Sequence, residues 1–161
     1  MKKFYNVMFP LFFLAFFPIT WLYILPANFV IDSLVVFLGM KHLKLDNKKE
    51  VYKKSILKVW LIGFLSDMLG CLVLLPSIFI KNDSFKEAMI WNLYKSPISV
   101  LLYCLAIFLA GLAIYYLNKK ISFKKTELNI PQIHKLSLYL AVFTAPYVLL
   151  IPTCLLYHSA F

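Results

Sequence analysis

The chain alternates between long apolar runs and short segments rich in lysine. A helix needs about 20 apolar residues to cross the roughly 30 Å hydrocarbon core of a bilayer. The apolar runs are continuous and lack the alternating pattern of a membrane β-barrel. We therefore expect an all-α polytopic transmembrane helix bundle that forms a single integral membrane domain over residues 1–161. The expected membrane segments are 4–25, 28–40, 54–80, 96–117 and 133–157, and a short surface helix is expected at 84–94.

The first apolar stretch allows two interpretations. Residues 4–40 carry only one charged side chain, that of Asp32, and as one helix they would be about 55 Å long, too long for one crossing. We place a turn at Pro26, because proline beside small or polar residues is typical of turns. Segment 28–40 is then a short second helix that inserts as a hairpin with the first. The alternative is one kinked span with an interfacial piece.

The composition excludes a soluble domain. Hydrophobic residues make up 62% of the chain and charged residues 15%, whereas soluble domains average about 45–50% and about 25%. So few charges cannot cover the surface of a soluble protein of this size. The three cysteines lie scattered within apolar runs, and we interpret them as buried small hydrophobic residues.

The lysines predict the orientation in the membrane. The net charge of +10 arises from 17 lysines, with no arginine, against seven acidic residues. Lysines are concentrated in residues 41–58 and 119–135, and lysine-rich loops face the cytoplasm. We expect a multi-pass protein of the cytoplasmic (inner or plasma) membrane with both loops and the N-terminus inside and the C-terminus outside. The partner is then the lipid bilayer and not a nucleic acid.

Two acidic residues interrupt the apolar runs. Asp32 lies nine residues before Lys41, and Asp67 lies nine residues after Lys58. If both lysines mark one membrane boundary, both acids lie about 13 Å deep on neighbouring helices. Such a pair would titrate as a coupled unit and could share a proton or hold a cation.

Other polar residues could join this possible ion or proton site. They are Asn28, Ser33, Ser66 and Lys58. The structural alternative is that the acids cap a helix or form inter-helix hydrogen bonds worth about 0.6–2 kcal/mol. Lys58 could equally extend to the membrane interface, as lysines near helix ends do.

Small residues mark two candidate helix-packing faces. Gly63 and Gly70 flank Asp67 at helical spacing, and Ala106, Ala110 and Ala113 share one face of segment 96–117. Small residues let helix backbones approach closely in membranes. We expect helix–helix seams here, within the chain or with a protein partner or a second copy.

The sequence lacks the motifs of common enzyme classes, and its histidines and cysteines do not have metal-ligand spacing. We therefore assign no catalytic residue, no metal and no cofactor. The leading hypothesis is a non-enzymatic subunit or regulatory component of a larger membrane assembly. The alternative is a small transport or ion- or proton-coupled component that uses Asp32 and Asp67. An intramembrane enzyme is a third possibility.

Overall fold

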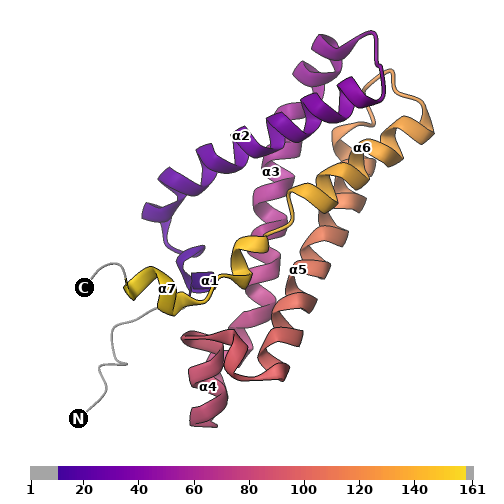
Figure 1. The fold of residues 1–161 in the computed structure, drawn as a ribbon. Helices are drawn as coiled ribbons and strands as arrows, with labels where there is room; N and C mark the ends of the chain where they lie inside the picture. The colour runs from indigo at the N-terminus through magenta and orange to yellow at the C-terminus, as the bar shows by residue number, and fades with distance from the viewer. Residues whose placement is uncertain (1–10, 159–161) are drawn as a thin grey trace.

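The computed structural model describes residues 11–158, which are all-helical with no strand. Four helices in this part of the chain are long and apolar enough to cross a membrane. These candidate spans are Pro18–His42, Lys48–Phe79, Pro97–Ser122 and Ile130–Leu150. They run alternately up and down in an elongated bundle (Figure 1). The all-α fold is confirmed, and the four apolar helices suggest a membrane location.

The first apolar stretch folds differently from the expectation. It forms α1 (Leu11–Leu14) and α2 (Pro18–His42), and α2 continues through Pro26 without a break. The predicted turn at Pro26, with separate helices at 4–25 and 28–40, is therefore wrong. The part of the expected first helix before Leu11 lies outside the described residues. The described chain holds four long segments instead of five.

Contacts with the next helix hold α2 in place beside Pro26. Proline has no N–H to donate to the carbonyl of Leu22 and usually disrupts a helix interior. Here the Trp60 indole donates a hydrogen bond of 2.8 Å to the Leu25 carbonyl. The Trp60 ring also packs edge-on against Phe29, with centroids 5.8 Å apart. Neighbouring helices that supply such contacts make proline tolerable within a membrane helix.

The two central helices match the sequence expectation closely. α3 (Lys48–Leu74) ends in the 3-10 helix η1 (Leu75–Phe79), and α5 (Pro97–Leu117) continues into the π-helix η3 (Asn118–Ser122). The expected segments 54–80 and 96–117 are confirmed as helices. α3 begins six residues earlier than expected and extends beyond the apolar run.

The last expected segment, 133–157, is broken where kinks were expected. It comprises α6 (Ile130–Phe143), the 3-10 helix η4 (Tyr147–Leu150) and α7 (Thr153–His158). The interruptions contain Pro146 and Pro152, which cannot donate backbone hydrogen bonds. α2 diverges from α3 toward its own N-terminal end, and α1 lies below the start of α2 (Figure 1).

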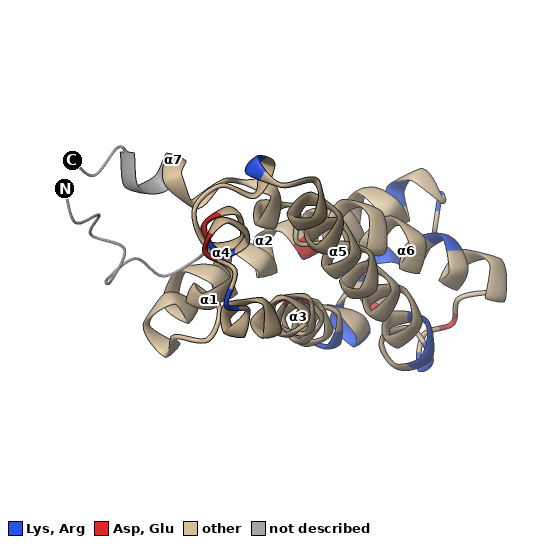
Figure 2. Ribbon diagram, turned by 90° about the horizontal axis from the view of Figure 1, so that it is seen from below, with Lys and Arg blue, Asp and Glu red and all other residues tan. Residues whose placement is uncertain are grey.

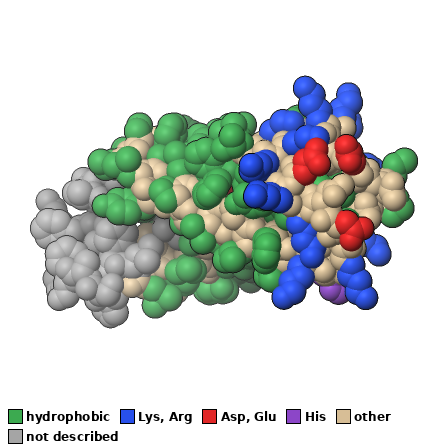
Figure 3. Space-filling view, turned by 90° about the horizontal axis from the view of Figure 1, so that it is seen from above, with side chains coloured by type: hydrophobic (Ala, Val, Ile, Leu, Met, Phe, Trp, Pro, Cys, Tyr) green, Lys and Arg blue, Asp and Glu red, His purple; other side chains and the backbone are tan. Residues whose placement is uncertain are grey.

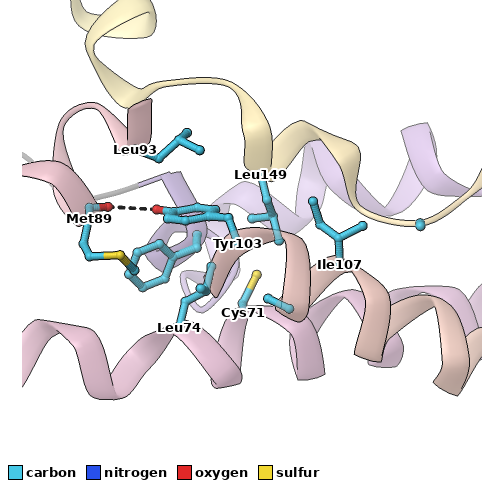
Figure 4. Close-up of a cluster of buried hydrophobic side chains, with 10 residues drawn as sticks. Cys71, Leu74, Met89, Leu93, Tyr103, Ile107 and Leu149 are labelled. Carbon is cyan, nitrogen blue, oxygen red and sulfur yellow. Dashed lines mark hydrogen bonds between the residues drawn. The ribbon is translucent and has the colours of Figure 1, made fainter. Parts of the chain in front are cut away.

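The expected surface helix at 84–94 is α4 (Asp83–Ile90), followed by the 3-10 helix η2 (Leu93–Lys95). The Asn82 side chain caps α4 by accepting a 3.0 Å hydrogen bond from the Phe85 amide. The apolar side of α4 packs against α3 and α5 in a buried cluster. Within this cluster the Tyr103 hydroxyl donates a 2.8 Å hydrogen bond to the Met89 carbonyl (Figure 4).

Most of the charged side chains gather at one end of the bundle. Lysines and acidic residues surround the α2–α3 and η3–α6 connections, a smaller group lies around α4 (Figure 2), and hydrophobic side chains cover the middle of the face that Figure 3 shows. Large apolar side chains point outward along every long helix, for example Leu34, Leu65, Leu101 and Leu138. An apolar belt of this extent is rare on monomeric soluble proteins.

Candidate functional site

Asp32 and Asp67 line one pocket inside the bundle. Its volume is about 640 Å³, and its walls come from α1, α2, α3 and the chain after α6. Most of the lining is apolar. The hydroxyl, amide and carboxyl groups that reach it belong to Thr20, Tyr23, Asn28, Asp32, Asp67, Thr144 and Tyr147. No lysine or histidine lines the pocket within the part of the chain that the structure describes.

The two acids lie on facing helices but at different depths. The Asn28 amide on α2 donates a 3.0 Å hydrogen bond to Asp67 Oδ2 on α3. One turn further along, Asp32 Oδ2 lies 2.9 Å from the position that a Cβ atom on Gly63 would occupy. Asn28 and Asp32 are four residues apart on α2, and so are Gly63 and Asp67 on α3. The carboxylates are thus offset by about 6 Å along the helices, whereas the lysine spacing predicted equal depth.

Each acid keeps one oxygen without a partner. Asp32 is only 2% exposed, and neither its Oδ2 nor Asp67 Oδ1 has a hydrogen-bond partner among the described residues. Both carboxylates line the same pocket. Burying an ionised carboxylate without a partner is costly. A proton or a cation bound at either carboxylate would lower that cost.

The break after α6 provides the third side of the pocket. The Thr144 side chain lies beside the Asp32 carboxylate, and its hydroxyl donates to the Leu140 carbonyl at 2.9 Å. Pro146 leaves the Val142 carbonyl without its helical donor, and the Tyr147 hydroxyl donates to that carbonyl at 2.7 Å. Interrupted membrane helices often border ion and substrate sites. Sequence reasoning missed Thr144, although Pro146 was a visible signal for the break beside it.

The other polar residues assigned to this site lie elsewhere. Ser33 accepts a 3.0 Å hydrogen bond from the Tyr52 hydroxyl. Ser66 is buried, and its hydroxyl has no partner among the described residues. Lys58 is half-buried toward the lysine-rich end of α3. None of the three lines the pocket, so the structure brings together only Asn28, Asp32 and Asp67 from the expected group.

The small-residue faces pack inside the chain. A Cβ atom on Gly70 would lie 3.2 Å from Ala110 Cβ and 3.3 Å from the Ala106 carbonyl oxygen. Ala106 and Ala110 are fully buried, and Ala113 is half-buried. These residues therefore form the seam between α3 and α5, while Gly63 faces Asp32 of α2. A protein partner or a second copy would have to use a different surface.

The described residues contain no group of three histidine, cysteine or acidic side chains arranged to hold a metal ion. The pocket offers two carboxylates with oxygen and amide neighbours, groups that can bind a proton or a hard cation. Compared with protein-family models, curated proteins and solved structures, the chain matches none. The pocket lined by Asp32 and Asp67 and the residues around it are therefore the basis for the function proposed below.

Proposed function

We propose that this chain is a small ion- or proton-coupled membrane component that binds a proton or a monovalent cation between Asp32 and Asp67. The observation that carries this proposal is that buried Asp32 and half-buried Asp67 line one pocket, each with a buried carboxylate oxygen that has no partner among the described residues. Because no basic side chain among the described residues lines the pocket, a bound proton or cation would supply the compensating positive charge. The Asn28 amide holds Asp67 in place, which leaves its other oxygen free to bind.

The lysine distribution supports a cytoplasmic-membrane location and an orientation. Seven lysines lie in residues 41–58 and five in residues 119–135, at one end of the bundle, against Lys81, Lys86 and Lys95 near the other. By the positive-inside tendency the lysine-rich end faces the cytoplasm. The predicted cytoplasmic N-terminus lies outside the described residues and stays a prediction. α7 follows the opposite end of the last span, which agrees with an external C-terminus.

This orientation gives the pocket a direction. α1 and Thr20 line it from the end opposite the lysines, so a ligand would enter from the outer side. Asp32 lies deeper than Asp67 from that side, because it is one turn closer to the lysine-rich end of both helices. A cation would therefore meet Asp67 first and Asp32 second. Two carboxylates at successive depths are an arrangement suited to a relay.

Infrared difference spectroscopy tests the proposal directly. We would reconstitute the full chain in lipid nanodiscs and record spectra on acidification and on adding Na⁺, with a bulky organic cation at equal ionic strength as the reference. We expect carboxyl bands that change in the native chain and are reduced in Asp32→Asn and Asp67→Asn. Asp83→Asn, in the exposed first turn of α4, is the matched control and should leave the bands intact. Identical spectra for all four proteins would refute the proposal.

The hypothesis of a subunit in a larger assembly stays a second prediction. The connections after α2 and after η3 are short, and the longer one before α5 holds α4, which packs against the bundle, so little of the described chain lies outside it. Mild crosslinking in native membranes followed by purification should then recover a defined partner in constant ratio. Recovery of the isolated chain alone would contradict this hypothesis without affecting the cation site.

A further inference from the structure

A second cavity lies between α5 and α6, on the outside of the bundle. Its volume is also about 640 Å³, and it shares only Ala145 and Tyr147 with the acid pocket. Most of its lining is apolar, from Cys104, Phe108, Leu112, Leu138 and Val142 among others. We call this cavity the α5–α6 groove. The volume is within the range of about 300–1,000 Å³ that is typical of small-molecule sites.

The length of the groove matches one leaflet of a bilayer. Its α5 side extends from Cys104 to Tyr116, twelve residues or about 18 Å of helix. Half of a hydrocarbon core of about 30 Å is about 15 Å. At Gly111 a Cβ atom would lie 3.4 Å from the Ala141 carbonyl oxygen, so the two helices come close and form the floor. An extended acyl chain would fit along this floor.

One end of the groove is polar and positively charged. The Tyr115 hydroxyl and His134 Nδ1 are hydrogen bonded at 2.7 Å, and Lys135 lines the cavity beside them. The Lys119 ammonium lies 5.9 Å from the centre of the Tyr115 ring. Neither lysine forms an ion pair with an acidic side chain in the part of the chain described. Both ammonium groups can therefore bind an anion at this polar end of the groove, which we call the groove mouth.

We propose that the α5–α6 groove binds one anionic phospholipid of the cytoplasmic leaflet, with an acyl chain along Gly111 and the phosphate between Lys119 and Lys135. Anionic lipids are recognised by basic side chains immediately cytoplasmic of membrane helices. Here Lys135 and the apolar floor line one cavity, and Lys119 lies beside it against the ring of Tyr115. This inference rests on the proposed membrane location and orientation but not on the acid pocket.

Photo-crosslinking tests the proposed lipid site. The full chain would be reconstituted in vesicles of phosphatidylcholine that contain a trace of phosphatidylglycerol with a photoactivatable acyl chain. The same probe on phosphatidylcholine is the reference for neutral lipid. We expect the anionic probe to label residues 104–116 and 134–147 several-fold more than the neutral probe does. Soluble glycerol phosphate, which has the head group but no acyl chain, should not compete.

Paired lysine variants separate this site from general surface attraction. Lys119→Gln with Lys135→Gln removes the charges at the groove mouth and should abolish the preference for the anionic probe. Lys49→Gln with Lys53→Gln removes two exposed lysines of α3 at the same end and should leave the preference unchanged. Ala141→Leu, which fills the floor, should lower labelling while the lysines remain.

Three results would overturn the lipid proposal. One is equal loss of preference in both lysine pairs, and another is competition by glycerol phosphate. The third is equal labelling of the apolar cavity between α2 and α6, which Leu34, Leu38 and Phe143 line without any lysine. Absence of labelling by either probe would instead show that the chain does not face lipid, which contradicts the membrane location itself.

Discussion

The Asp32 carboxylate lies directly against the backbone of Gly63, where a Cβ atom would be only 2.9 Å from Asp32 Oδ2. Real Cβ atoms essentially never approach an oxygen so closely. With the Asp32 side chain in this position, there is no room for a side chain at residue 63. The same contact holds the deeper carboxylate of the candidate site in position, so helix packing and site geometry depend on one residue.

Gly63→Ala should displace the Asp32 carboxylate and weaken the α2–α3 seam. Overpacking of this kind costs about 1–3 kcal/mol, and we expect that loss in unfolding by denaturant together with a reduced infrared response to Na⁺. Gly111→Ala is the matched control, because its Cβ would meet the Ala141 carbonyl oxygen at 3.4 Å, an ordinary contact distance. Equal behaviour of the two variants would show that the Asp32–Gly63 contact has no special role.

The Asn28–Asp67 hydrogen bond should be energetically coupled across the α2–α3 seam. Asn28→Ala leaves the Asp67 carboxylate without its donor and should cost about 1–3 kcal/mol of stability. In a double-mutant cycle with Asp67→Ala, we expect a coupling energy of about 0.6–2 kcal/mol. Additive effects of the two substitutions would contradict a direct bond in the folded protein.

The sequence predicts the helices of this fold better than their interruptions. Continuous apolar runs identified α3 and α5, because the length of a membrane helix follows from the thickness of the bilayer. The turn at Pro26 was wrong because Trp60, 35 residues further along the chain, supplies a contact to α2 that local turn preferences do not include. The sequence shows where the proline lies, but it does not show which residues of other helices contact the chain beside it.

The candidate site was also predictable only in part, because it depends on contacts between segments that are distant in the sequence. Two acids in apolar runs indicated Asp32 and Asp67, because intramembrane carboxylates are costly and usually functional. Their offset of one turn depends on how α2 and α3 are aligned, which the Asn28–Asp67 and Asp32–Gly63 contacts show. Thr144 lies in the break after α6 and comes from a third segment of the chain. The spacing of residues within one segment could therefore not predict that it lies beside Asp32.

Tyr103→Phe tests whether α4 is attached to the bundle. The substitution removes the hydroxyl that donates to the Met89 carbonyl, and both residues are buried. An unpaired buried carbonyl costs about 1–3 kcal/mol, so we expect lower stability and faster proteolysis within residues 81–96. Tyr94→Phe is the control, because Tyr94 is 60% exposed and its 3.1 Å bond to the Leu150 carbonyl lies at the surface. Equal effects would contradict the docked position of α4.

Pro26→Ala distinguishes one continuous α2 from a hairpin that turns at residue 26. In the continuous helix, alanine supplies an N–H for the Leu22 carbonyl, and stability should rise by up to about 3 kcal/mol. A hairpin would instead lose its turn residue and become less stable. Pro18→Ala is the control, because Pro18 occupies the first helical turn of α2, where no N–H is required, and its effect should stay below about 1 kcal/mol. Denaturant unfolding of both variants in the same detergent measures the difference, and a destabilised Pro26→Ala would overturn the single-helix structure of α2.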